Sequence, residues 1–174
     1  MPITRLNHAV LFVRNVERSK AFYTEVLGFR EVLAEGAQAL PGAAFLQAPG
    51  STNDHDLGIF QVGSQAGPSG AGRSTVGLYH LAWEVDTLGE LQRLAERLEQ
   101  AGALAGASDH STTKSLYGKD PDGLEFEIAW VVPAALLDSA ALAGRASIRP
   151  LDMPRELARY GAATRGGIGI SVPA

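Results

Sequence analysis

Two histidines, His8 and His80, occupy matching places in two similar stretches of the chain. Residues 6–13 read L-N-H-A-V-L-F-V, and residues 78–85 read L-Y-H-L-A-W-E-V. Burying an imidazole in an apolar strand has a desolvation cost, so two of them at equivalent positions indicate a shared purpose. Neutral imidazole is a common metal ligand. The pair therefore predicts part of a metal site.

A carboxylate would complete such a site, because two histidines and one carboxylate form the facial triad that leaves open positions on non-haem Fe(II). Glu125 and Glu127 are the candidates, in the otherwise apolar run L-E-F-E-I-A-W. Glu125 lies beside a turn, where water can solvate it. Glu127 lies within the strand and needs a positive partner. We predict that His8, His80 and Glu127 hold a metal ion.

A repeated strand and helix must position these residues. The strand at 6–13 precedes a helix that Asn15 caps and that continues to about Leu27, where Gly28 ends it. The strand at 78–85 precedes a helix to about Gln100 that Thr87 and Glu90 open as a capping box. Further strands are expected at 29–34, 43–47, 56–62, 112–117 and 124–131. The pattern predicts an α+β fold in which two βαβββ modules form a partly closed mixed β-barrel around the metal site.

Changes in composition along the chain predict its boundaries. We expect a single domain over residues 1–132, made of module one (1–62), a flexible Gly-rich linker (63–75) and module two (76–132). The C-terminal extension, 133–174, should be mostly helical, since A-A-L-L-D-S-A-A-L-A and M-P-R-E-L-A-R-Y have helical character.

Composition also excludes several function classes. The net charge of −4 without a basic run argues against nucleic-acid binding. No run of about 18 apolar residues is present to span a membrane, and the first residues lack a secretory signal, so a cytoplasmic location is expected. With no cysteine, a metal must rely on His, Asp or Glu. Strand edges exposed on the barrel make a homodimer or higher homo-oligomer the expected assembly.

Residues 109–127 carry a longer motif, D-H-S-T-T-K-S-L-Y-G-K-D-P-D-G-L-E-F-E, whose Asp-Pro-Asp-Gly favours a hairpin turn. With the doubled module, it resembles the vicinal oxygen chelate superfamily, which includes glyoxalase I, fosfomycin-resistance enzymes, bleomycin-binding proteins and type I extradiol dioxygenases. The motif is similar to the extradiol signature of His, an apolar residue before Tyr, Asp-Pro, Gly and a final Glu. His110, Tyr117 and Glu127 stand at the required spacing, which Glu125 does not satisfy.

This resemblance implies an Fe(II)-dependent extradiol dioxygenase that cleaves a catechol-type aromatic ring with O2. Mn(II) would suit the same ligands. The segment N-D-H-D-L-G-I-F resembles the one that carries the family's acid–base histidine, which implies that role for His55. His110 and Tyr117 would hydrogen-bond the bound substrate.

Two alternatives use the same fold. A glyoxalase- or fosfomycin-resistance-type metalloenzyme is one, and Gln61 is the candidate for the fourth protein ligand that glyoxalase I takes from module one. A bleomycin-type ligand-binding protein is the other, and it would need no metal. Two His and one Glu at the metal positions argue against a metal-free binding module.

Overall fold

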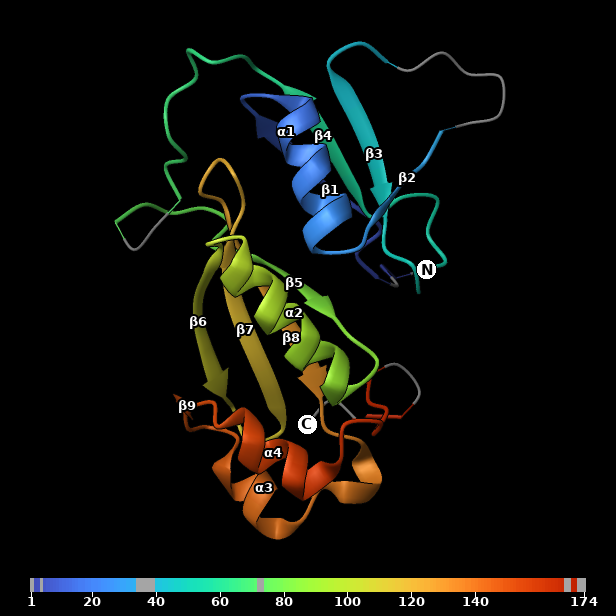
Figure 1. The fold of residues 1–174 in the computed structure, drawn as a ribbon, viewed down its shortest axis with the longest axis vertical. Coiled ribbons are helices and arrows are strands. Elements are labelled where there is room, and N and C mark those ends of the chain that lie inside the picture. Colours follow the sequence, from blue (N-terminus) through green and yellow to red (C-terminus); the bar gives the residue numbers. More distant parts are fainter. Residues whose placement is uncertain (1, 4, 34–39, 72–73, 168–169, 172–174) are drawn as a thin grey trace. The chain divides into compact units, whose positions relative to one another are not determined.

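The computed structural model describes residues 2–3, 5–33, 40–71, 74–167 and 170–171. The chain forms two compact units (Figure 1), of which unit 1 comprises residues 1–69 and 120–123, and unit 2 comprises 70–119 and 124–174. Each unit has its own sheet with a helix alongside it. Within the described residues, no helix has the length and apolar character needed to cross a membrane.

Unit 1 consists of β1 (Ala9–Val13), α1 (Val16–Ala21), the π-helix η1 (Phe22–Val26), β2 (Arg30–Glu31), β3 (Ala43–Gln47) and β4 (Leu57–Gln61). Its sheet has the strand order β1-β4-β3-β2. Strand β1 runs parallel to β4, and the other pairs are antiparallel. Apolar side chains at Val13, Leu46, Leu57 and Ile59 are buried and form its core.

Unit 2 repeats this plan with β5 (Leu81–Glu84), α2 (Leu88–Gln100), β6 (Leu104–Asp109), β7 (Thr113–Lys119) and β8 (Glu125–Val131). The extension adds η2 (Ala134–Leu136), α3 (Ser139–Gly144), β9 (Arg149–Pro150) and α4 (Met153–Tyr160). The sheet order is β5-β8-β7-β6-β9, and β5 runs parallel to β8. The predicted α+β class and the repeat of the module are confirmed.

Local sequence signals explain the helix that follows the first strand in each module. The Asn15 side chain accepts a hydrogen bond from Arg18 N at 2.8 Å, which caps α1 as predicted. Thr87 Oγ1 caps α2 by accepting from Glu90 N at 3.2 Å. Gly28 ends the first helical segment with φ of 81°, a conformation that glycine adopts without steric cost.

The strands that follow the histidines are shorter than predicted. Strand β1 begins at Ala9 and β5 at Leu81, so each histidine lies one residue before its strand. The strand expected at 29–34 is reduced to Arg30–Glu31, and residue 34 lies outside the described residues. Strand β6, which sequence pattern did not locate, reads L-A-G-A-S-D and lacks the β-branched and aromatic residues typical of strands.

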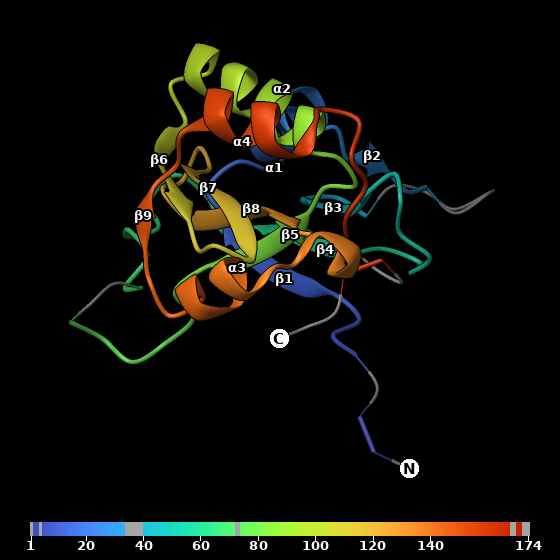
Figure 2. The ribbon, with the colours of Figure 1, turned by 90° about the horizontal axis from the view of Figure 1, so that it is seen from below.

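The C-terminal extension packs within unit 2, where α4 lies beside α2 (Figure 2). Gly89 N on α2 donates to Ala162 O at 2.8 Å, and a Cβ at residue 89 would stand 2.9 Å from that oxygen. Glycine is therefore required for this close approach. The indole of Trp130, which is fully buried, donates to Thr164 O at 3.2 Å. The extension thus completes the core of unit 2.

Candidate functional site

His80 and Glu127 meet in unit 2, where His80 Nε2 lies 3.1 Å from Glu127 Oε2. The parallel pairing of β5 with β8 brings them together, because Leu81 pairs with Phe126 and Ala82 with Glu127. Both side chains are largely shielded from solvent. An imidazole nitrogen and a carboxylate oxygen therefore lie within hydrogen-bond distance of each other.

This pair fits two ligands of one metal ion. Imidazole nitrogen and carboxylate oxygen bind a divalent metal at about 2.0–2.2 Å, so two such ligands at a right angle stand about 3 Å apart. The observed separation of 3.1 Å between His80 and Glu127 is compatible with that spacing and is also that of a direct hydrogen bond between the two side chains. The other carboxylate oxygen, Glu127 Oε1, accepts a hydrogen bond from Ser115 Oγ at 2.5 Å. That hydrogen bond fixes the orientation of the carboxylate, as outer partners of metal ligands do.

Tyr117 lies opposite Glu127 in the register of β7 and β8, and its hydroxyl is 2.9 Å from His110 Nε2. The ring of Tyr117 stands 6.0 Å from the ring of His80. Burial raises the pKa of Tyr117, the charge of Glu127 raises it further, and a hydrogen bond with Ser115 lowers it only in part. The phenol therefore stays protonated and can donate a hydrogen bond.

His110 lies in the turn between β6 and β7, not on a strand of the hairpin. Its backbone N donates to Thr113 O at 2.9 Å, and its backbone O accepts from Thr112 N at 2.8 Å. The three-residue turn thus presents the imidazole toward Tyr117. The structure brings four predicted residues together in unit 2, namely His80, His110, Tyr117 and Glu127.

The other two predicted residues, His8 and His55, lie together in unit 1. Their ring centroids are 4.6 Å apart, with the planes tilted by 42°. His8 Nδ1 is 2.8 Å from Asn7 Oδ1, and His55 Nδ1 is 2.9 Å from Asp54 Oδ2. Histidines that bind metals or move protons commonly use one ring nitrogen in this way, which orients the other for chemistry. The predicted acid–base residue is thus beside a predicted metal ligand.

The predicted triad is divided between the units, with His8 in unit 1 and both His80 and Glu127 in unit 2. Within the described part of the chain, no group of three or more His, Asp or Glu side chains is placed to hold a metal ion. The triad therefore stays a prediction, and the structure shows only that His80 and Glu127 lie 3.1 Å apart.

Ser115 is the one residue of this arrangement that the sequence motif did not identify. It lies two residues before Tyr117 on the same strand, so both side chains point to the same face of the sheet. Its hydrogen bond to Glu127 connects neighbouring strands across that face. The two-residue period from Tyr117 was the signal available in the sequence.

Comparisons with known proteins show the family of the chain. The family model described as "Glyoxalase/Bleomycin resistance protein/Dioxygenase superfamily" matches residues 5–128. The chain is 34% identical over 125 residues to catechol-2,3-dioxygenase from Bacillus subtilis, covering 72% of this chain and 41% of that protein. It is 32% identical over 130 residues to biphenyl-2,3-diol 1,2-dioxygenase 3 from Rhodococcus globerulus, covering 71% of this chain and 62% of that protein.

The chain therefore spans less than two thirds of the length of these relatives. Among solved structures, it is similar to a glyoxylase/bleomycin resistance protein/dioxygenase domain from Frankia sp. EAN1pec. The TM-score is 0.60 at 24% identity, with 75% of this chain and 93% of that chain covered. Similarity at this level shows a shared fold.

Proposed function

Because this chain belongs to the glyoxalase/bleomycin resistance protein/dioxygenase superfamily, we propose that it is an extradiol dioxygenase that opens a catechol-type ring with Fe(II) and O2. The observation that carries the proposal is the 3.1 Å approach of His80 to Glu127, next to a protonated Tyr117. The names of the two dioxygenase relatives support an aromatic diol as the substrate.

In this proposal His8, His80 and Glu127 hold the metal. When bound, Fe(II) would supply Lewis acidity and open positions for the two catechol oxygens and O2. Mn(II) accepts the same nitrogen and oxygen donors. Metal ligation by Glu127 would place a cation against a carboxylate that is largely shielded from water, which offsets its desolvation.

His55 is the proposed acid–base residue. A base must lie within hydrogen-bond reach of the proton that it removes, and a substrate bound to the metal would be near a residue that contacts a metal ligand. The ring of His55 contacts that of His8, and the Asp54 carboxylate at Nδ1 would stabilise the protonated imidazole. His55 would take a catechol proton and later return it.

Tyr117 and His110 are proposed to orient the substrate. With its pKa raised by burial, Tyr117 keeps its proton and can donate to a catechol oxygen. His110 Nε2, 2.9 Å from the phenol oxygen, would hold the hydroxyl by donating a hydrogen bond to it. The pair thus orients the substrate ring in the site.

A glyoxalase-type site would need a fourth ligand from module one. The register makes Gly58 the counterpart of Glu127, because Gly58 pairs with Val10 as Glu127 pairs with Ala82. Glycine has no side chain that could serve as a ligand. Gln61, the candidate from the sequence, accepts a hydrogen bond from Val16 N at 3.1 Å and so serves the start of α1. These observations favour three protein ligands over four.

The test is anaerobic reconstitution of the full chain with Fe(II), followed by a panel of catechols in air. We expect O2 uptake and the yellow colour of a ring-fission product. Stoichiometric iron without O2 uptake on a broad panel would exclude the proposal. Turnover of a hemithioacetal without O2 by the same preparation would support the glyoxalase alternative.

A further inference from the structure

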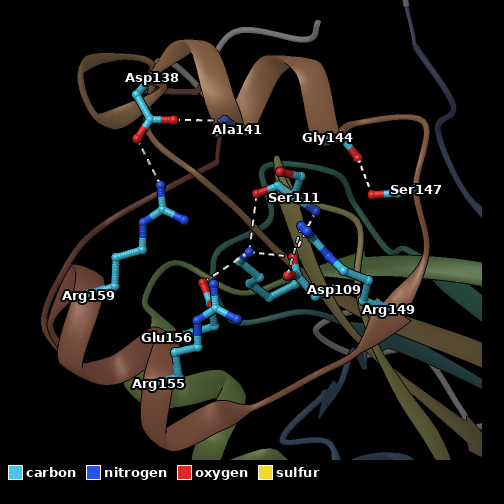
Figure 3. A network of polar contacts seen from close by, with 11 residues as sticks. Asp109, Ser111, Asp138, Ala141, Gly144, Ser147, Arg149, Arg155, Glu156 and Arg159 are labelled. Atoms are coloured by element: carbon cyan, nitrogen blue, oxygen red, sulfur yellow. Dashed lines mark hydrogen bonds and ion pairs between the residues drawn. The ribbon is translucent and has the colours of Figure 1, made fainter.

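Lys114 is a buried cation in unit 2, and its ammonium group contacts one carboxylate from the neighbouring strand β6 and one from the C-terminal extension. Its side chain is 1% exposed, and Nζ lies 2.5 Å from Asp109 Oδ1 and 3.0 Å from Glu156 Oε2. Asp109 ends β6 and Glu156 lies on α4, and the two side chains converge in Figure 3. A buried ammonium persists only where opposite charges and hydrogen bonds compensate its desolvation.

The same cluster holds the turn between β6 and β7. Ser111 has φ of 69°, the only positive value for a non-glycine residue in the described part of the chain. Its N–H donates to Asp109 Oδ1 at 2.7 Å, and its C=O accepts from Lys114 Nζ at 3.1 Å. Such a left-handed conformation persists when the surroundings over-determine it, and here Asp109 and Lys114 do so.

Ser111 directly follows His110, so the conformation of the turn sets the direction of the imidazole. A change of φ at Ser111 would rotate His110 relative to β7. The 2.9 Å contact between His110 and Tyr117 depends on that direction. The backbone at Ser111 therefore connects the buried cluster around Lys114 to the hydrogen-bonded pair of His110 and Tyr117.

The C-terminal extension supplies two charged groups of the cluster. Glu156 comes from α4, and Arg149 of β9 approaches Asp109 Oδ2 at 3.4 Å. Both lie beyond residue 128, where the match to the family model ends. Arg155 is also near, 3.9 Å from Glu156 Oε1, but its side chain is mostly exposed. Each buried carboxylate thus has cationic partners.

We propose that the C-terminal extension positions His110 and Tyr117 by holding Lys114 against the Ser111 turn. Glu156 and Lys114 are positioning residues, since they act through the turn and not on the substrate. The proposal rests on the proposed function for its effect on turnover. The coupling between the extension and His110 can be measured without any reaction.

The first experiment uses the full chain with 13C-labelled histidine, whose four rings can be assigned by single substitutions. Glu156→Gln removes one charge of the cluster at nearly constant shape. Asp138→Asn is the matched control, because Asp138 pairs with Arg159 in the same extension and asparagine still caps α3. We expect the ring signals of His110 to shift in Glu156→Gln and to stay in place in Asp138→Asn.

Arg149→Gln is the second variant, in case Glu156→Gln does not fold. The Arg149 side chain is 53% exposed, so its loss should be tolerated. We expect a smaller displacement of the His110 signals. Unchanged His110 signals in every folded variant of the cluster would overturn the proposal.

Turnover supplies the second measurement. Displacement of the pair should lower kcat on a catechol by about 100-fold in Glu156→Gln, as small misplacements of catalytic groups do, with KM and metal content unchanged. Shifted His110 signals with unchanged kcat would overturn the positioning role. An inactive wild-type chain would instead overturn the proposed function, and the histidine spectra would still decide the coupling.

Discussion

The two modules share one backbone plan and differ in chemistry at equivalent positions. In both modules the first strand pairs in parallel with the fourth, β1 with β4 and β5 with β8, and the first strand is preceded by a histidine. The register relates the two copies, because Phe45 pairs with Gly58 as Tyr117 pairs with Glu127. Three pairs of counterparts differ: Ala43 and Ser115, Phe45 and Tyr117, and Gly58 and Glu127.

The difference shows that the backbone of the module does not require polar groups at these positions. In unit 1 the ring of Phe45 contacts His55 at 5.0 Å between centroids. In unit 2 its counterpart Tyr117 holds His110 through a hydrogen bond. One position therefore supports a histidine in both units, by apolar contact in the first and by a polar contact in the second. Module two carries the carboxylate and the hydroxyls.

The largest expected effect comes from removing the carboxylate of Glu127, which has no counterpart in module one. We expect Glu127→Gln to lower the affinity for Fe(II) by more than about 100-fold, beyond what the loss of an outer partner of a metal ligand causes. Turnover should be lost with it. Metal titration with a chelator measures the affinity. Glu125→Gln, two residues away on the same strand, is the control, and equal metal loss in both variants would contradict the assignment.

The second effect tests the contribution of unit 1. We expect His55→Ala to keep its metal and to lose turnover by about 100- to 10,000-fold, the range for removal of a general acid or base. Iron content and O2 uptake of the same preparation measure the two properties. Unchanged turnover would remove His55 from the site and leave its ring as a packing partner of His8.

Replacing a residue of module two by the residue type of its counterpart in module one gives a third, smaller effect. Tyr117→Phe gives module two the residue type that module one has at Phe45. We expect kcat to fall by about 100-fold, because the variant lacks the donor to the substrate oxygen, while iron content stays the same. Steady-state O2 uptake measures kcat and KM. A higher KM at unchanged kcat would mean that the hydroxyl binds substrate without acting in the reaction step.

Local patterns in the sequence predicted the parts of the molecule that local forces determine. The caps at Asn15 and Thr87 and the similar apolar stretches around His8 and His80 are short-range signals, and the structure shows the helices and strands that they indicate. The placement of Glu127 followed from its distance to a turn. Each of these inferences used residues within one or two elements.

Contacts between distant segments had no such signal. Nothing near Lys114 in the chain indicates that Glu156 neutralises it, because packing of α4 against unit 2 brings them together. The contact between His8 and His55 likewise depends on β1 pairing with β4. The π-helix over Phe22–Val26 was also missed, since a shift in hydrogen bonding leaves the apolar pattern of the helix nearly unchanged.

The smallest expected effect is on the stability of the fold in acid, and it comes from the buried charges of unit 2. Burial raises the pKa of Asp109, but hydrogen bonds from Lys114 and Ser111 and the charges of Lys114 and Arg149 outweigh it and hold the pKa below the usual 3.8. A carboxyl group whose pKa is lower in the folded than in the unfolded state stabilises the fold at pH values above its unfolded pKa. That contribution is lost as the pH falls through its folded pKa.

We therefore expect the contribution of Asp109 to the free energy of unfolding to be constant above about pH 5 and to decline below about pH 4. Asp109→Asn should be less stable at neutral pH and should lose less stability on acidification, because asparagine can still accept from Ser111 N but carries no charge to protonate. Urea unfolding at a series of pH values measures both quantities. Parallel acid limbs for the wild type and Asp109→Asn would show that other carboxylates dominate and that Lys114 draws its compensation from Glu156.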